Sequence, residues 1–291
     1  MSQYSIKEVE SLSGVKAHTL RIWEQRYDFL KPDRTDTNIR FYNDDQLKLI
    51  LNISTLNRSG MRISKIVSLD ANTLCKEVEK LAEQQAEPNI LLDALIHSMI
   101  DFDEDRFEKT LSCAILQHGF AKAFSELVFP LMTRTGVLWS TGVVYPAQEH
   151  FISNLVRRKI CAAIESQHVV RNQHTKKFAL FLPEGETHEL VLLFTEYILR
   201  QHNHHVAYLG GSLPFDDISF IRKSFKPDYL VTYFCIPPVE MPLQEYINQL
   251  SNNFSSEKII VGGKQIDLQQ PTLPVNVTPV RCINSLMKAI S

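Results

Sequence analysis

The sequence has 291 residues, of which 44% are hydrophobic and 22% are charged, and its formal net charge is −2. These proportions are typical of a globular protein with two or three domains. They exclude a transmembrane protein, since no apolar run approaches the roughly 20 residues of a bilayer span, and the polar start MSQYSIKEVE is not a signal peptide. The five cysteines show no paired spacing, so we expect a reduced, cytoplasmic protein without membrane contact.

Two short helices joined by a glycine turn are predicted at the start of the chain. Ser5 and Glu8 have the spacing of a capping box, which marks the beginning of the first helix. Gly14 then turns the chain, and a second helix over 16–27 places Trp23 on its inner face. This arrangement indicates a helix-turn-helix whose second helix is the recognition helix.

A polar hairpin and two more helices are predicted next. The segment DRTDTNIRFYN has the character of a β-ribbon wing, and helices begin near Asn43 and near Arg62. The chain carries an ordered series of three motifs, TLRIWEQRY, P-x-R and IRFY. Over residues 4 to about 68, this series closely resembles the MerR family of winged helix-turn-helix regulators. The resemblance implies that residues 1–72 form a domain that binds double-stranded promoter DNA.

The same resemblance implies which side chains meet the DNA. The recognition helix would enter the major groove, and the wing would contact backbone phosphates, which position the protein while base edges specify the site. The predicted DNA contacts are His18, Thr19, Arg21 and Arg26 in the recognition helix, and Arg34, Arg40 and Tyr42 in the wing.

A linker helix over 73–88 and a helical bundle over 89–170 are predicted after this domain. Four bundle helices are expected, over 89–102, from Asp103, over 120–133 and over 146–166. MerR proteins usually dimerise through a long helix, and the linker helix is too short for that coiled coil. We therefore expect a homo-oligomer, a dimer or tetramer, assembled through residues beyond 89.

The bundle carries the pattern Trp139, nine residues, then Glu149-His150. Taken alone, the pattern also fits a core tryptophan beside a solvated Glu–His pair. It resembles the bundle signature of photoreceptor repressors of the CarH and LitR type, which bind adenosylcobalamin. The resemblance implies that these three residues contact the cofactor's upper face. Ser140 departs from well-known members, which have a histidine there that can take the upper cobalt position after illumination.

Strands and helices alternate over the predicted third domain, residues 175–291. Such alternation indicates a flavodoxin-like, Rossmann-type doubly wound parallel sheet. The expected strands are 177–182, 205–209, 228–234, 258–262 and 277–281, and the expected helices are 187–202, 215–225, 238–251 and 283–290.

The loop after the first of these strands carries Glu186 and His188. It lies at the carboxyl end of a strand, where open α/β sheets bind their ligands. An imidazole there can bind a metal while a carboxylate orients its second nitrogen, although a solvated loop histidine fits the pattern as well.

Two further segments, together with this loop, form a series of three motifs. Ser212-Leu213 follows a double glycine, and Gly262-Gly263 follows a later strand, so the series resembles the cobalamin-binding motifs. The resemblance implies that His188 is the lower axial ligand of cobalt, next to Glu186. It also implies that the serine and double-glycine positions line a slot for the cofactor's dimethylbenzimidazole tail. Val191 departs from the family, which usually has glycine three residues after the histidine.

Together these patterns predict a multidomain α and α/β protein that acts as a transcriptional repressor. Cobalamin, and adenosylcobalamin and light in particular, would control its oligomerisation and promoter binding. One alternative is a cobalamin-independent regulator whose degenerate α/β domain serves oligomerisation or partner binding. A second is a methyl-transferring corrinoid enzyme, which the N-terminal helix-turn-helix argues against, so we do not expect an enzyme.

Overall fold

The computed structural model describes residues 4–27, 29–35, 37–84, 88–140, 144–170 and 172–290, apart from the side chains of residues 79, 82–84, 88 and 137–140. The chain divides into two compact units, Met1–Leu155 and Val156–Ser291. None of the described helices is both long and apolar enough to cross a membrane.

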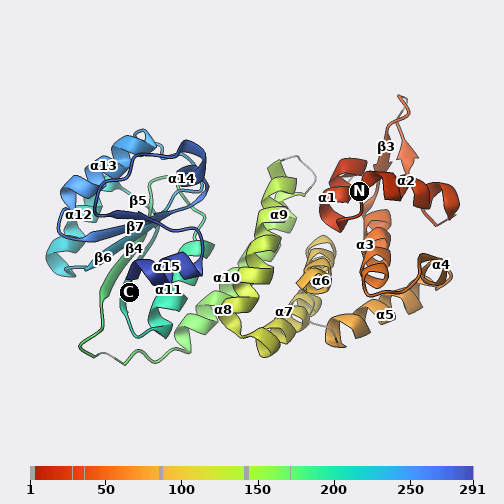
Figure 1. The fold of residues 1–291 in the computed structure, drawn as a ribbon, viewed down its shortest axis with the longest axis horizontal. Coiled ribbons are helices and arrows are strands. Elements are labelled where there is room, and N and C mark those ends of the chain that lie inside the picture. The colour runs from red at the N-terminus through yellow and green to blue at the C-terminus, as the bar shows by residue number, and fades with distance from the viewer. Residues whose placement is uncertain are drawn as a thin grey trace. The chain divides into compact units, whose positions relative to one another are not determined.

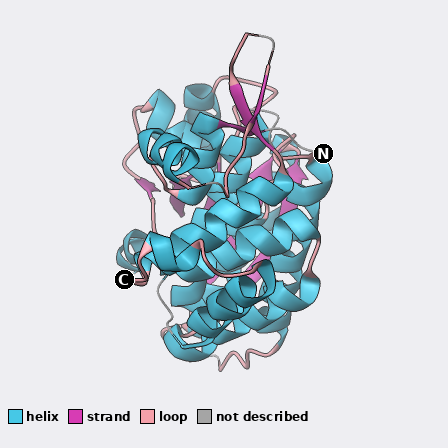
Figure 2. Ribbon diagram, turned by 90° about the vertical axis from the view of Figure 1, so that its right-hand side faces the viewer, coloured by secondary structure: helices cyan, strands magenta, loops and turns pink. Residues whose placement is uncertain are grey.

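The first unit begins with the predicted helix-turn-helix and wing (Figure 1). Ser5 and Glu8 form the expected capping box at the start of the first helix. The wing strands pair antiparallel in the order β1-β3-β2, and their hairpin projects from the surrounding helices (Figure 2). The elements are β1 (Tyr4–Ser5), α1 (Ile6–Ser13), α2 (Ala17–Arg26), β2 (Asp33–Arg34), β3 (Arg40–Tyr42), α3 (Asp44–Arg58) and α4 (Ile63–Ile66).

The remaining helices of this unit form the predicted bundle. Its core is built from Leu95, Phe107, Phe124, Leu131 and Ile152, all fully buried. The expected helix over 120–133 is longer, runs to Ser140 and includes a π-helical turn. The elements are α5 (Ala71–Gln84), α6 (Pro88–Asp101), α7 (Glu104–His118), α8 (Phe120–Ala123), η1 (Phe124–Val128), α9 (Phe129–Ser140) and α10 (Pro146–Glu165).

The DNA-binding segment and most of the bundle share one compact unit. Helix α3 makes this connection, because it packs against both α5 and α6. Residues 85–87, where the linker helix was expected to end, lie outside the described residues.

The second unit is the predicted doubly wound fold. Its five strands are all parallel, in the order β5-β4-β6-β7-β8. Buried residues of α12, α13 and α14 pack in one core cluster with the sheet, while α11 and α15 lie together on the other face (Figure 1). The strands are β4 (Lys177–Pro183), β5 (His205–Leu213), β6 (Tyr229–Tyr233), β7 (Lys258–Gly262) and β8 (Val277–Pro279). The helices are α11 (Leu190–Gln201), α12 (Phe215–Ser224), α13 (Leu243–Asn253), α14 (Lys264–Gln269) and α15 (Ile283–Ile290).

Candidate functional site

The outer face of α2 carries most of the residues predicted to contact DNA. His18, Arg21 and Arg26 are exposed and Thr19 is half-buried, while Trp23 is buried on the opposite face. The helix therefore presents one polar, largely basic surface, as a recognition helix requires.

The turn before α2 is held by Glu10. Gly14 adopts a φ of 70°, and its N–H donates to the Glu10 carbonyl at 2.9 Å. The Glu10 carboxylate accepts from Nζ of Lys16 and from the N–H of Ala17, both at 3.0 Å. The hydrogen bonds from Lys16 and Ala17 lower the pKa of Glu10. This carboxylate thus caps the amino end of α2 and fixes where the helix begins.

The wing is tied to α2 through another carboxylate. Glu24 accepts from Nη2 of Arg34 at 2.7 Å and from Nε of Arg40 at 2.6 Å. Burial acts to raise the pKa of Glu24, but the hydrogen bonds from Arg40 and Arg34 outweigh it, so the pKa is lowered. The two predicted phosphate-contacting arginines therefore also hold the wing against the recognition helix.

Tyr42 lies in the core of this segment instead of on its surface. Its side chain is 0% exposed, it pairs with Tyr4 across the sheet, and its hydroxyl is buried without a hydrogen-bond partner among the described residues. Burial also raises the pKa of this hydroxyl. A phosphate contact needs an exposed donor, so this placement corrects the prediction that Tyr42 touches DNA.

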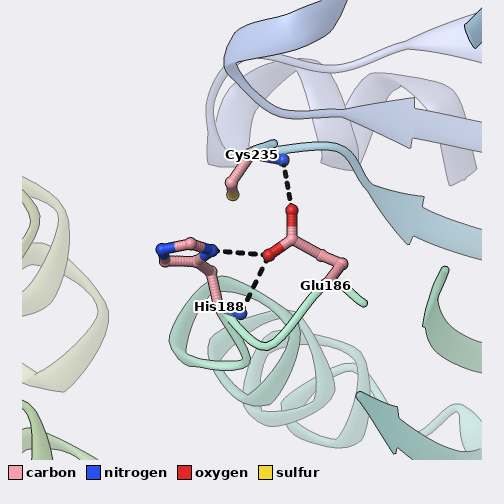
Figure 3. Close-up of side chains that lie close together, drawn as sticks. All are labelled: Glu186, His188 and Cys235. Carbon is pink, nitrogen blue, oxygen red and sulfur yellow. Dashed lines mark hydrogen bonds and ion pairs between the residues drawn. The ribbon is translucent and has the colours of Figure 1, made fainter. Parts of the chain in front are cut away.

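A second candidate site lies at the carboxyl ends of β4 and β6. These strands are neighbours, and the chain after β4 returns to the sheet as β5 on the opposite side of β4 from β6. This is the topological switch point of the sheet, where doubly wound folds bind their ligands. Glu186 and His188 follow β4, and Cys235 follows β6 (Figure 3).

Glu186 organises this site from a buried position, with 2% of its side chain exposed. Its Oε1 accepts from the N–H of His188 at 3.0 Å and lies 2.5 Å from Nδ1 of the same residue. Its Oε2 accepts from the N–H groups of Cys235 and Ile236, each at 2.8 Å. Burial acts to raise the pKa of Glu186, but the hydrogen bonds from His188 and Ile236 outweigh it and lower the pKa. A charged carboxylate is thus fixed behind the imidazole.

This arrangement sets the chemistry of the His188 ring, which is 60% exposed. Because Nδ1 donates its proton to a carboxylate, the lone pair available for a metal lies on Nε2. A carboxylate in this position also raises the basicity of a ligating imidazole. The sequence placed these two residues in one loop, and the structure brings them into contact.

Cys235 completes the cluster and was not predicted. The ligand atoms of Glu186, His188 and Cys235 lie within 4.8 Å of one another. Burial, with a smaller contribution from Glu186, raises the pKa of Cys235 to about 12, so the thiol stays neutral. Its position just after a buried strand, at the ligand-binding edge of the sheet, is the signal that could have identified it.

The end of β5 supports the loop. The N–H of Ser212 donates to the Glu186 carbonyl at 3.0 Å, and the Ser212 hydroxyl accepts from the N–H of Gly185 at 3.1 Å. A Cβ at Gly211 would lie 3.1 Å from the Glu186 carbonyl oxygen, so a small residue allows the two chains to approach. Leu213, from the same predicted motif, packs instead against the core cluster of the sheet.

Gly262 ends β7 and Gly263 follows it, and the sequence implied that both line a slot for the cofactor's tail. A Cβ at Gly262 would lie 2.6 Å from Cε1 of Tyr233, so the tyrosine ring already fills the space beside this glycine. The Tyr233 hydroxyl lies 2.8 Å from Oγ1 of Thr195 in α11, and Thr195 donates to the Val191 carbonyl. Gly263 has a φ of +97°, and a Cβ there would lie 2.5 Å from the Phe234 carbonyl oxygen.

The loop with Glu186 and His188 and the predicted tail slot beside Gly262 therefore differ in how well they fit cobalamin. His188, oriented by Glu186, presents an imidazole of the kind that can ligate a metal. Tyr233, whose burial raises its pKa to about 12, lies against Gly262, one of the two glycines expected to line the tail slot.

In the bundle, Glu149 and His150 lie together near the start of α10. Their side chains are 2.8 Å apart, and they are 27% and 73% exposed respectively. Trp139 and Ser140 belong to α9, but their side chains lie outside the described part of the chain.

Comparison with known proteins separates the two segments of the first unit. Residues 4–72 match the family model "MerR HTH family regulatory protein", and residues 91–163 match the model "B12 binding domain". The second match covers the helical bundle from α6 to α10.

Curated relatives and one solved structure are similar to longer parts of the chain. The transcriptional repressor CarH of Myxococcus xanthus is 28% identical over 78% of this chain and 77% of its own length. The repressor CarA of the same organism is 22% identical over 89% of this chain and 85% of its own. The monomethylamine corrinoid protein of Methanosarcina barkeri shares the fold over 70% of this chain and 99% of its own, with 12% identity and a TM-score of 0.54.

These findings support a regulator that binds DNA and responds to cobalamin, and the named relatives are regulators rather than enzymes. The chain thus combines a segment that matches the MerR HTH family model with a segment that matches the B12 binding domain model, and it is similar to the repressor CarH over most of its length.

Proposed function

We propose that the chain is a cytoplasmic repressor whose oligomerisation and promoter binding are controlled by cobalamin, in its adenosyl form and with light as the signal. The names of CarH and CarA support repression. The observation that carries the cofactor assignment is the contact between Nδ1 of His188 and buried Glu186, which leaves Nε2 as the ring nitrogen that would bind a metal.

When bound, cobalamin would supply a cobalt ion that accepts nitrogen ligands. This chain contributes His188 as the proposed lower ligand, Glu186 as the residue that orients it, and Ser212 as support for the loop. Trp139, Glu149 and His150 are proposed to contact the upper group. Light sensing at cobalt would have to proceed without a histidine at position 140, where this chain has serine.

On the DNA side, we propose that His18, Thr19 and Arg21 face the major groove and that Arg26 lies nearer the DNA backbone. Arg34 and Arg40 would reach phosphates from the wing. Helix α5 has 14 residues, or about 21 Å of helix, which is short for a dimerisation coiled coil. Self-association through other surfaces would bring several DNA-binding segments to one promoter and raise avidity.

The direct test is the absorption spectrum of the full chain, incubated with adenosylcobalamin in the dark and then desalted. We expect wild-type protein to retain a corrinoid spectrum and His188→Ala to lose most of it. His174→Ala, an exposed histidine in another loop of the same unit, is the matched control and should behave as wild type. Light scattering on the same samples, before and after illumination, tests whether the cofactor changes the oligomer. Equal retention by His188→Ala would contradict the assignment.

Tyr233 favours a second candidate, a MerR-type regulator whose α/β unit no longer holds cobalamin. Its ring fills the space beside Gly262, and its hydroxyl forms a hydrogen bond with Thr195 of α11. Thr195 in turn donates to the carbonyl of Val191, one turn earlier in the same helix. If the wild type retains no corrinoid, Tyr233→Ser should restore retention by opening this space, and Tyr233→Phe should not. Binding of promoter DNA without any corrinoid in all three proteins would establish the second candidate.

A further inference from the structure

A cavity of about 220 Å³ lies within the first unit, lined by residues of α3, α5, α6 and α7. It is separate from the His188 cluster, which belongs to the other unit. An engineered apolar cavity of about 150 Å³ binds benzene, so a space of this size suits a ligand of roughly nine non-hydrogen atoms. A corrinoid ring is too large for it, and so is a protein helix, which is about 10–12 Å across.

Two ion pairs explain why the space exists. Helices α3 and α6 run antiparallel, with Lys48 paired to Asp101 at one end and Arg58 paired to Asp93 at the other. Between these pairs the wall includes Ala94, whose small side chain cannot span the gap. The ion pairs hold the two helices at a fixed separation, and the cavity lies between them.

The charged side chains of the wall already have partners. Lys48 pairs with Asp101, and Nη1 of Arg106 lies 3.9 Å from the same carboxylate. Nε of Arg106 also lies 3.6 Å from Asp103, and Lys109 takes part in an interaction of its own. An ionic ligand would have to break these pairs or leave its own charge unpaired outside water. The wall therefore favours neither an anion nor a cation.

The uncharged side chains of the wall are mostly apolar. Val78 and Ala94 contribute methyl groups, and Cys75 and Cys113 contribute thiols, which pack like small hydrophobic groups. The amide of Asn52 donates to Sγ of Cys75 at 3.7 Å, so this polar group is engaged as well. A ligand that covers these side chains would gain stability mainly by removing apolar surface from water.

His97 adds a ring to the wall without adding a charge. It lines the cavity and is 5% exposed. Burial, together with the charges of Arg106 and Lys48, lowers the pKa of His97 to about 3, so the imidazole is neutral at physiological pH. A flat apolar ligand can pack against such a ring.

We propose that this cavity binds a small uncharged apolar molecule, of about the size of a monocyclic aromatic compound such as benzyl alcohol. The ligand packs against Val78, Ala94 and the ring of His97, and the ion pairs around it stay intact. Cys75 and Lys109 are exposed, so the ligand enters from the surface beside them.

Binding at this place would act on the DNA-binding segment. Helix α3 begins directly after wing strand β3, and its cap Asn43 accepts from the N–H of Gln46 at 2.9 Å. The Tyr4 hydroxyl donates to Asp44 at 2.7 Å and ties the same end of α3 to β1. A ligand that joins α3 and α5 to α6 and α7 thus restrains the helix that follows the wing. This effect does not depend on cobalamin.

The test uses the full chain and benzyl alcohol as the probe. At millimolar concentration the probe should slow alkylation of Cys75 and Cys113, which line the cavity, as followed by peptide mass spectrometry. Cys282, an exposed thiol in the other unit, is the internal control and should react at an unchanged rate. Protection of all three thiols alike, or of none, would overturn the proposal. Protection that grows with protein concentration without any probe would also overturn it, because a second copy of the chain would then fill the cavity.

The preference for an uncharged ligand is tested with two ions of similar shape. Benzylammonium carries a positive charge and benzoate a negative charge. Both should bind at least about tenfold more weakly than benzyl alcohol, because each would place an unpaired charge outside water. The apparent affinities follow from the dependence of the Cys75 alkylation rate on probe concentration. Equal or tighter binding of either ion would overturn the proposal.

Substitutions in the wall test the place of binding. Ala94→Leu should abolish the protection of Cys75 by filling the space. Val78→Asp should weaken binding of benzyl alcohol severalfold and strengthen binding of benzylammonium, since it adds an unpaired carboxylate. Leu116→Asp, at an exposed position of α7 outside the cavity, is the matched control and should change neither. Equal effects of Val78→Asp and Leu116→Asp would overturn the proposal. If a wall variant does not fold, the comparison of the three probes on the wild type decides.

Discussion

Two carboxylates organise the two candidate sites, and they are held in different ways. Glu24, 15% exposed, receives two guanidinium groups from the wing. Glu186, 2% exposed, receives an imidazole and three backbone N–H groups. Backbone donors are fixed by the fold, whereas arginine side chains can leave for another anion such as a DNA phosphate.

The difference matches what each site has to do. A DNA interface exchanges partners and responds to salt, so ion pairs between long side chains suit it. A metal-ligating imidazole must keep one orientation, and a buried carboxylate with backbone donors provides it. We therefore expect substitutions at Glu186 to cost more stability than substitutions at Glu24.

The largest effect is expected for Glu186→Ala. It removes the acceptor of three partly buried N–H groups and releases His188, so the free energy of unfolding of this unit should fall by about 3 kcal/mol. Hydrogen exchange followed by mass spectrometry should show lost protection in 184–189 and 234–237. Glu245→Ala, an exposed acid on α13, is the control, and equal losses in the two variants would refute the structural role of Glu186.

A third carboxylate, Asp93, is buried in the first unit, and its contribution to stability is expected to depend on pH. It bonds to Thr55 and pairs with Arg58, yet burial outweighs both and raises its pKa to about 6. A raised folded-state pKa means that its stabilising effect is complete below the unfolded value of about 3.8 and is lost as pH rises through about 6.

Wild-type stability should therefore fall between pH 4 and pH 7 relative to Asp93→Asn, by at most about 3 kcal/mol. Both tryptophans lie in the first unit, so urea unfolding followed by tryptophan fluorescence reports on this unit directly. A difference between the two proteins that is constant with pH would show that Asp93 keeps an ordinary pKa.

At the DNA face, substitution of Arg21 should mainly affect sequence specificity, and substitution of Arg26 should affect affinity for all DNA sequences. If Arg21 reaches a base edge, Arg21→Ala should reduce discrimination between operator and mismatched DNA by about 1–3 kcal/mol. Arg26→Ala should weaken binding to all sequences alike and lower the salt slope by about one. Fluorescence anisotropy at several salt concentrations distinguishes the two, and identical behaviour would contradict the assignment of Arg21 to a base.

The sequence predicted most of the elements because their signals are local. The Ser5–Glu8 capping box and the apolar strands of the α/β unit lie at the expected positions. Helix α14 was missed, since its six residues are too few to show a helical period. Glu186 and His188 were found because they are two residues apart in one loop.

The missed residues depend on contacts between distant segments. Tyr233 ends β6 and Cys235 follows it. Both reach the site only because β6 pairs with β4, a register that no local pattern reveals. Tyr42 was placed at the surface because a strand of three residues does not show which side chains face the core. The Glu24–Arg40 pair joins residues 16 positions apart, and the sequence offered several other partners for each.

The smallest effect on stability is expected for Glu24→Gln. Ion pairs near a surface contribute roughly 1 kcal/mol or less, so the free energy of unfolding should change little. Affinity for non-specific DNA should rise severalfold at low salt, because one negative charge is removed and Arg34 and Arg40 are released toward phosphates. The rise should fade near physiological salt, where the screening length is about 8 Å. Glu77→Gln on α5 is the control. If Glu24→Gln instead destabilises the protein as much as Glu186→Ala does, Glu24 is a structural anchor, and the contrast between an exchangeable and a fixed carboxylate does not hold.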